Sequence, residues 1–253
     1  MKARISLSTG EKTVDFSRPI RISMPLSRYG ANPNAYHLPT ALVTHVSAGG
    51  FIGDVSAGGS CNCDILTLAP HGNGTHTECV GHISADRLFI KDTLACTLAH
   101  ARIQSLTHKH PFKNGDRVIS ASDIAECLKN FTGDALVVRT LPNDADKQTR
   151  QWSGSNPPYF EQGTGVILRE HGIRHLLCDV PSVDRETDGG VMNVHHEFWH
   201  YPENPRRDAT ITEMIFVPDS VTDGDYLLQI SVPPIESDAA PSDILLYRFE
   251  DAA

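Results

Sequence analysis

Short apolar runs separated by turns that contain Gly or Pro recur along most of the chain. Residues 134–141 (DALVVRTL) form a β-branched apolar run directly after a glycine, which predicts a buried strand. Residues 121–131 (ASDIAECLKNF) carry apolar side chains at helical spacing, with Ser and Asp at the start, which predicts a helix. Residues 159–172 (YFEQGTGVILREHG) predict a second helix, which ends at Gly172.

Three further apolar runs predict strands in the second half of the chain. They are 173–180 (IRHLLCDV), 211–217 (ITEMIFV) and 226–232 (YLLQISV), and the turn PDSVTDGD separates the last two. The sequence contains no repeat, no low-complexity tract and no long linker. We therefore predict a single mixed α/β domain over residues 1–253, with more strand than helix.

Composition and charge narrow the classes of partner. The 253 residues are 40% hydrophobic, which suffices for one sizeable core. The formal net charge of −9 disfavours nucleic acid and anionic membrane surfaces as partners, because both would repel the chain. No apolar run approaches the roughly 20 residues that span a bilayer. The N-terminal residues lack the apolar region of a signal peptide, so we expect a cytoplasmic protein.

The six cysteines show no paired spacing typical of a zinc site. In a cytoplasmic chain we expect them to be reduced and mostly buried. Cys61 and Cys63 could together bind a metal, but a single pair without a second one is weak support.

Candidate chemistry is concentrated in residues 71–82, HGNGTHTECVGH. In an extended segment His76 and Glu78 point to the same face, and His82 has the same parity. Imidazole and carboxylate are common ligands of Zn²⁺ and Mn²⁺. The alternative is a surface turn in which histidines happen to cluster.

A second group of histidines lies in residues 180–200, which contain His195, His196 and His200. Glu213 follows on the predicted strand 211–217. The remaining histidines lack supporting neighbours, and we expect them to be solvated or structural: His37, His45, His100, His108, His110, His171 and His175.

The segment 71–82 resembles the His-x-Gly-Thr-His-x-Asp-x-Pro-x-His motif of the Putative cyclase family, which includes bacterial kynurenine formamidase and isatin hydrolase. Other segments are similar to blocks of this family in the same order along the chain. They are VDFSRPI with MPL, DALVVRTL, GVILREHGIRHLLCDVPSVD, VHHEFW, ITEMIFVPDSVTDGDYLL and PPIESDAAPSDILL. The resemblance thus covers most of the chain.

The resemblance implies a compact fold of the swivelling β/β/α type that assembles as a homodimer or a higher homo-oligomer. It also implies one or two divalent metal ions, with Zn²⁺ as the first choice and Mn²⁺ as the second, and no organic cofactor. The metal ligands that it implies are His71, His76, Glu78, His195 and Glu213. His82 matches the last motif histidine, which acts in proton transfer.

The chain departs from the family motif at several positions. Four residues instead of three separate His71 from His76, so a bulge or loop must absorb the extra residue if His71 is to face the metal. Glu78 replaces the motif Asp, and Val80 replaces the motif Pro. His195 and His196 are adjacent, so on a strand only one of them would face the site; the resemblance favours His195. Ser182 and Asp184 match the family's Ser-x-Asp, for which we expect a structural or substrate-loop role.

These features predict a metal-dependent amidohydrolase of the arylformamidase type. Its substrate would be a small aryl formamide such as N-formylkynurenine, attacked by a metal-activated water with His82 as the proton shuttle. Two alternatives remain open: hydrolytic ring opening of a cyclic amide such as isatin, and a non-catalytic relative that binds metal or ligand. A structural zinc site is disfavoured, because no cysteine lies in register with the histidines.

Overall fold

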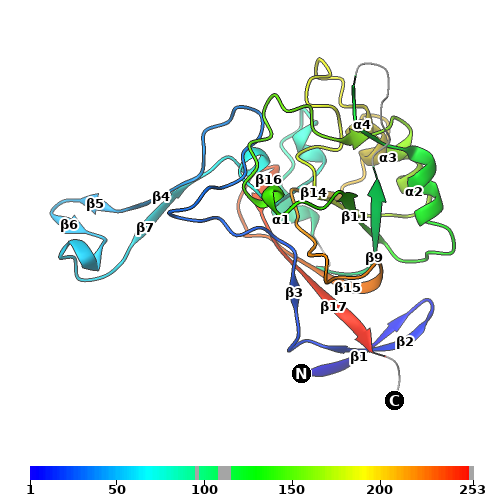
Figure 1. Ribbon diagram of the computed structural model, residues 1–253, viewed down its shortest axis with the longest axis horizontal. Coiled ribbons are helices and arrows are strands. Elements are labelled where there is room, and N and C mark those ends of the chain that lie inside the picture. Colours follow the sequence, from blue (N-terminus) through cyan, green and yellow to red (C-terminus); the bar gives the residue numbers. More distant parts are fainter. Residues whose placement is uncertain (95–96, 108–114, 251–253) are drawn as a thin grey trace.

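The computed structural model describes residues 1–94, 97–107 and 115–250, and most of their strands pair into one sheet (Figure 1). Within these ranges the sheet has 11 strands. In spatial order they are β1 (Lys2–Leu7), β2 (Gly10–Asp15), β17 (Asp243–Glu250), β15 (Gly224–Ser231), β9 (Leu98–Thr107), β11 (Ala135–Leu141), β13 (His175–Cys178), β14 (Thr210–Glu213), β8 (His76–Glu78) and β16 (Ala239–Pro241), while β3 (Ile20–Arg21) pairs with β17. The central strands β9, β11, β13 and β14 are parallel, and the strands on both flanks are antiparallel.

The central strands are buried on both faces, as expected for parallel strands. Along β11, Leu136 and Val138 point into one apolar cluster and Val137 points into another. This alternation follows from the period of two along a strand. The predicted strand at 134–141 is confirmed.

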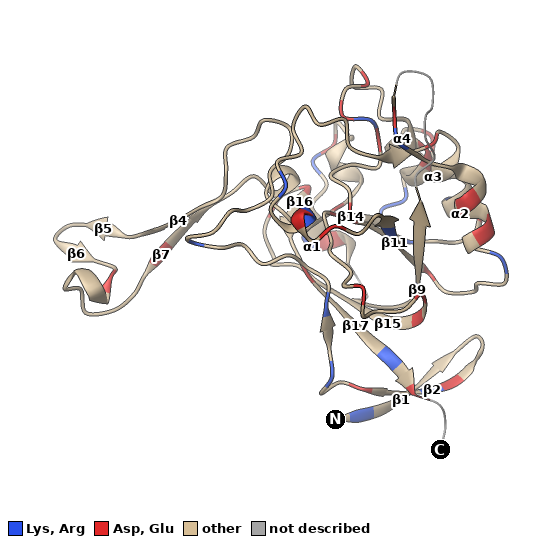
Figure 2. Cartoon of the chain, in the orientation of Figure 1, with Lys and Arg blue, Asp and Glu red and all other residues tan. Residues whose placement is uncertain are grey.

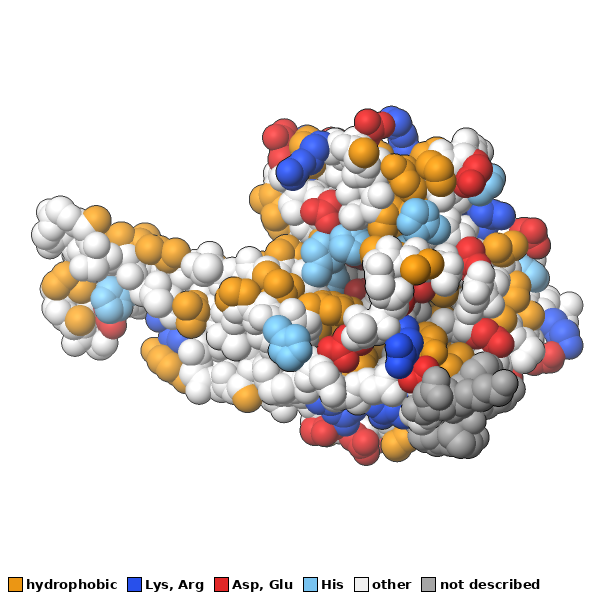
Figure 3. Space-filling view, turned by 90° about the horizontal axis from the view of Figure 1, so that it is seen from above, with side chains coloured by type: hydrophobic (Ala, Val, Ile, Leu, Met, Phe, Trp, Pro, Cys, Tyr) orange, Lys and Arg blue, Asp and Glu red, His pale blue; other side chains and the backbone are white. Residues whose placement is uncertain are grey.

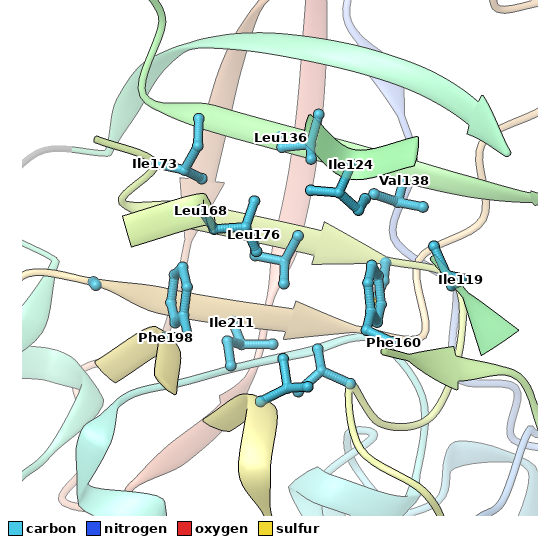
Figure 4. Packing of buried hydrophobic residues seen from close by; sticks show 14 of the residues in the cluster. Ile119, Ile124, Leu136, Val138, Phe160, Leu168, Ile173, Leu176, Phe198 and Ile211 are labelled. Atoms are coloured by element: carbon cyan, nitrogen blue, oxygen red, sulfur yellow. The ribbon is translucent and has the colours of Figure 1, made fainter. Parts of the chain in front are cut away.

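Helices cover the first of these faces (Figure 4). They are α2 (Ala121–Cys127), α3 (Thr164–Glu170) and α4 (Asn193–Trp199), and α1 (Ile90–Thr93) lies elsewhere. Leu168 of α3 and Phe198 of α4 pack in one cluster with Leu176 of β13. Each such buried side chain stabilises the fold by about 1.5–3 kcal/mol. No helix within the described ranges is long and apolar enough to cross a bilayer.

The opposite face packs against the C-terminal strands. Val137 and Leu177 meet Leu228 of β15 and Leu246 of β17 there, and Ile22 completes the layer. The predicted strands at 173–180 and 226–232 are present as β13 and β15. The molecule is therefore a mixed α/β domain with more strand than helix, as predicted.

Two predicted helices are shorter than expected. The Ser120 hydroxyl caps α2 by accepting a hydrogen bond from the Asp123 N–H at 3.1 Å, and the helix ends at Cys127. The prediction for 159–172 was wrong in its first half, where Tyr159 and Phe160 form β12 and pair with β10 (Val118–Ile119). Its end was right, because Gly172 adopts a positive φ of 76° directly after α3.

The predicted strand at 211–217 is also cut short. It ends at Glu213 because Met214 adopts φ 52°, in the left-handed region. The Met214 and Ile215 N–H groups then donate to the carbonyls of Val180 and Cys178. Glu213 therefore stands at the exact end of a buried strand.

A long hairpin projects from the body of the domain (Figure 1). It consists of β4 (Leu42–His45) paired with β7 (Asp64–Thr67), and its tip contains β5 (Ser47–Ala48) and β6 (Phe51–Ile52). The hairpin carries few charges (Figure 2), and Leu42 and Leu66 are 55% and 64% exposed. The sequence did not predict this hairpin, because its short apolar runs resemble those of strands in the body of the domain.

A buried ion pair joins β11 to the end of β13. The Lys147 ammonium donates to Asp179 at 2.8 Å and to the Thr140 carbonyl at 2.7 Å, and both charged side chains are at most 3% exposed. The Thr140 N–H also donates to Asp179 at 2.8 Å.

Removal of the Lys147 charge should therefore destabilise the fold strongly. We expect Lys147→Met to lower the free energy of unfolding by about 3–5 kcal/mol, since Asp179 would keep a buried charge without a partner. Urea unfolding followed by circular dichroism measures this loss. Lys129→Met, which breaks the exposed pair with Glu126, is the control and should change little. Equal effects of the two variants would contradict the prediction.

Candidate metal centre

Strand β8 supplies two side chains of the centre. His76 and Glu78 are fully buried and lie two residues apart, so they share one face of the strand. Glu213 of β14 lies directly opposite His76 in the antiparallel register. The His76 Nε2 atom is 3.4 Å from Glu213 Oε2 as a result.

His71 reaches the same point through a turn. The segment Pro70–Gly72 forms a 3₁₀ turn, and Gly74 adopts φ 106°, so together they absorb the extra residue of the motif. A side chain at Gly72 would meet the Leu38 side chain and the Ala35 carbonyl, which explains the glycine there. His71 Nδ1 lies 3.1 Å from Glu78 Oε2.

His195 enters from α4 rather than from a strand. The strand geometry considered for His195 and His196 was wrong, because both lie on α4, and of the two it is His195 that turns into the cluster. Its Nε2 atom is 3.2 Å from Glu78 Oε1 and 4.0 Å from Glu213 Oε1. His196 instead places Nδ1 3.1 Å from the Tyr201 carbonyl.

Asp184 holds the His195 ring in place. Its Oδ2 atom accepts a hydrogen bond from His195 Nδ1 at 2.6 Å, and the carboxylate also accepts the backbone N–H groups of Val194 and His195. This leaves His195 Nε2 free to face Glu78. Ser182 accepts the Asp184 N–H at 3.1 Å, so both members of the Ser-x-Asp pair have structural contacts.

His82 also faces Glu78, although it does not lie on an extended strand. It ends the 3₁₀ turn Val80–His82, so the parity argument was wrong for this residue. His82 Nε2 is 3.8 Å from Glu78 Oε2, and its ring stacks on that of His71 with centroids 4.1 Å apart.

The sequence analysis missed Asp238. Its Oδ2 atom lies 2.7 Å from His71 Nε2 and 3.3 Å from His82 Nδ1. Asp238 directly precedes β16, which pairs with β8. In the sequence, Asp238 is an acidic residue that precedes the strand near the C-terminus. Its neighbours do not indicate that it contacts His71 and His82, which lie more than 150 positions away.

Buried atoms without hydrogen-bond partners show that this cluster suits a cation. They are His76 Nε2 and both carboxylate oxygens of Glu78. The His76 Nδ1–H donates to the Gly74 carbonyl at 2.9 Å, so Nε2 presents a lone pair. A buried carboxylate and a buried lone pair within 4.8 Å of each other need a positive charge between or beside them. The groups His71–His76–Glu78 and Glu78–His82–His195 each bring three ligand atoms within 4.8 Å of one another.

In the absence of a metal, protons supply that charge. Burial lowers the pKa of His71, but the neighbouring carboxylates of Asp238 and Glu78 outweigh it and raise the pKa to about 10. Burial likewise opposes protonation of His195, and Asp184 and Glu78 raise its pKa to about 10. Burial raises the pKa of Glu78, but His82, His195 and His71 together hold it well below its usual range.

A pocket opens over the cluster. Its volume is about 270 Å³, and apolar groups of Tyr36, Leu38 and Met192 line it together with Arg185 and the cluster residues His71, His82 and Glu213. Figure 3 shows histidine side chains gathered around a hollow on this face of the body. The cluster is thus accessible to a small molecule from one side.

Within the described residues, none of the remaining histidines and cysteines belongs to a group that could hold a metal ion. His175 is buried beside Thr210, and burial lowers its pKa to about 4. Cys79, Cys127 and Cys178 are buried as predicted, whereas Cys61 and Cys63 are exposed on the hairpin. His108, His110 and Cys96 lie outside the described residues.

Comparisons with known proteins place the chain in a family. The family model described as Putative cyclase matches residues 14–185. A sequence search of curated proteins gives no match.

Similar solved structures share the fold over nearly the whole chain. One is an isatin hydrolase bound to the product analogue thioisatinate, with a TM-score of 0.67 and 14% identity over 92% of this chain and 93% of that one. Isatin hydrolase A from Ralstonia solanacearum has a TM-score of 0.65 and 12% identity over 91% of both chains. A predicted metal-dependent hydrolase from Bacillus stearothermophilus has a TM-score of 0.62 and 16% identity over 91% of this chain and 98% of that one. These structures confirm the predicted fold class.

Metal binding should depend on pH with a definite sign. At pH 7 the metal-free protein keeps His71 and His195 protonated, because both pKa values are about 10. A metal ion must displace these protons, so we expect its affinity to increase as the pH rises from 7 toward 10. Calorimetric titration with Zn²⁺ in two buffers of different ionisation enthalpy measures the protons released.

The expected result is release of one to two protons per ion bound at pH 7. His76→Ala serves as the control, since it removes a buried ligand and should abolish the titration. Binding that releases no proton would contradict the assignment of His71 and His195 to the metal site.

Proposed function

The chain belongs to the Putative cyclase family, as its motifs predicted, and on this premise we propose that it is a metal-dependent hydrolase of a small amide. The observation that carries the proposal is the buried Glu78 carboxylate, whose two oxygens have no hydrogen-bond partner and face histidine nitrogens. A pocket of about 270 Å³ is lined by His71 and His82, which contact this group, and by Glu213. The combination of an unsatisfied ligand set and an open side is typical of a catalytic metal site.

Five residues would hold the ion: His71, His76, Glu78, His195 and Glu213. Imidazole and carboxylate donors suit Zn²⁺ first and Mn²⁺ second. Glu78 directs Oε2 toward His71 and Oε1 toward His195, so both of its oxygens would be available as ligands. When bound, a divalent ion lowers the pKa of a water ligand toward about 7 and polarises an amide carbonyl.

His82 is the residue that we assign to proton transfer. It lines the pocket, and its Nε2 atom faces Glu78 Oε2 at 3.8 Å. There it would accept a proton from the attacking water and return it to the departing nitrogen, because an amide nitrogen leaves poorly without protonation. Imidazole titrates near neutral pH and can therefore carry out both steps.

The pocket favours a compact substrate with an apolar or aromatic part. Tyr36, Leu38 and Met192 offer apolar surface beside the cluster. We propose an aryl formamide such as N-formylkynurenine as the first candidate. A cyclic amide is the alternative, supported by the fold shared with isatin hydrolases. Release of formate marks the first reaction, whereas a ring-opening absorbance change without formate marks the second.

Replacement of His82 should separate catalysis from metal binding. We expect His82→Ala to reduce kcat about 10²–10⁴-fold while the metal content per chain stays at the wild-type value. Elemental mass spectrometry and the two substrate assays provide the readouts. His196→Ala is the matched control, because His196 lies on the same side of the sheet but turns away from the pocket.

Two results would reject the proposed function. Full activity of His82→Ala would remove the proton shuttle. Absence of bound metal from the wild type, even after addition of Zn²⁺ or Mn²⁺, would instead identify a non-catalytic relative.

We further propose that the chain forms a homodimer or a higher homo-oligomer through the projecting hairpin. Ile65 and Leu66 expose 48% and 64% of their surface on β7. A two-stranded hairpin is only marginally stable by itself, so its apolar side chains gain most by packing against a second copy.

Charged substitutions on the hairpin should disrupt this assembly. We expect Leu66→Asp to shift the protein from a dimer or tetramer toward the monomer in light scattering coupled to size exclusion. Ile235→Asp, at an apolar residue of 43% exposure outside the hairpin, should leave the assembly unchanged. A monomeric wild type would reject the proposed assembly.

A further inference from the structure

We propose that Asp238 is a positioning residue whose carboxylate fixes the tautomers of both His71 and His82. The inference rests on the proposed function, because it assigns His71 to the metal and His82 to proton transfer. A single oxygen, Oδ2, lies 2.7 Å from His71 Nε2 and 3.3 Å from His82 Nδ1.

The geometry decides which nitrogen of each ring carries the hydrogen. A carboxylate only accepts hydrogen bonds, so the nitrogens that face Asp238 must be the protonated ones. In the metal-bound protein the lone pairs would then lie on His71 Nδ1 and His82 Nε2, which face Glu78 Oε2 at 3.1 Å and 3.8 Å. One carboxylate thereby presents a metal-binding lone pair on one ring and a proton-accepting lone pair on the other.

Asp238 is held firmly against the strand that carries the ligands. The Asp238 carbonyl accepts the Cys79 N–H at 3.0 Å, and the neighbouring Ser237 carbonyl accepts the Ile90 N–H at 2.8 Å. Ala239 pairs with Glu78 in the next position of the sheet. The backbone of Asp238 is therefore fixed relative to β8, and the contacts with His71 and His82 orient its carboxylate.

A ligand role for Asp238 fits this geometry less well. His71, His82 and Asp238 do bring three ligand atoms close together. However, an ion held by Glu78 faces the nitrogens on the opposite edges of the two rings. The stacked rings, at a centroid distance of 4.1 Å, lie between Asp238 and that position.

The test compares Asp238→Asn with Glu236→Gln in full-length protein saturated with Zn²⁺. Glu236 is two residues away, and its side chain is 69% exposed near Lys91, so it controls for the loss of one charge in this loop. Imidazole ¹⁵N chemical shifts report the tautomer of His82, which is assigned by comparison with His82→Gln. The metal content and the kinetics of amide hydrolysis are measured on the same samples.

We expect wild type and Glu236→Gln to show His82 protonated at Nδ1 and unprotonated at Nε2. In Asp238→Asn the side-chain amide can donate to Nδ1 and favour the reversed tautomer. In the zinc-saturated protein we expect kcat to fall roughly 10²–10⁴-fold with KM little changed, as when the carboxylate partner of a catalytic histidine is replaced by an amide. We also expect the zinc affinity to fall about 10–100-fold, because His71 loses the acceptor behind its ring.

Two results would overturn the inference while leaving the metal site intact: an unchanged His82 tautomer in Asp238→Asn, and an equal loss of kcat in Glu236→Gln. A wild type that binds no zinc would reject the proposed function itself and this inference with it.

Discussion

The buried negative charge of Glu78 is the constraint on which the rest of the site depends. A carboxylate with no exposed surface and no hydrogen-bond donor is expensive unless a cation or protonated groups surround it. His71, His82 and His195 approach it from a 3₁₀ turn, a second turn and a helix. On the side away from Glu78, His71 and His82 contact Asp238, and His195 contacts Asp184. Acidic and basic groups therefore alternate outward from Glu78.

The pairing of the strands determines where the side chains of the site lie. β8 is a strand of only three described residues between β14 and β16, yet both neighbours contribute to the site. Glu213 stands opposite His76 in one register, and Ala239, next to Asp238, stands opposite Glu78 in the other. Because a slip of one residue would turn every side chain to the other face, the registers fix which side chains meet. The packed parallel strands beside β14 hold the whole edge in place.

The sequence alone predicted the parts of the structure that local patterns determine. The run at 134–141 could only be a buried strand, and His76 with Glu78 had to share a face once the segment was extended. Other features depend on contacts between distant segments, and local patterns do not encode these. The switch from β12 to α3 within 159–172 and the end of β14 at Met214 follow from tertiary hydrogen bonds. Asp238 becomes visible only after β16 is placed beside β8. The family resemblance predicted the fold and brought His195 and Glu213 into the ligand set, which spacing could not do.

The distribution of the proposed ligands along the chain affects how strongly a metal stabilises the fold. His71, His76 and Glu78 lie within eight consecutive residues, whereas His195 and Glu213 arrive only with the folded sheet. An unfolded chain therefore retains a short peptide that still chelates the ion. A ligand stabilises a protein only to the extent that it binds the native state more tightly than the denatured state. The metal would therefore raise the free energy of unfolding by less than its affinity for the native state alone implies. The same peptide would let the ion associate with the nascent chain before the second half of the domain has been synthesised.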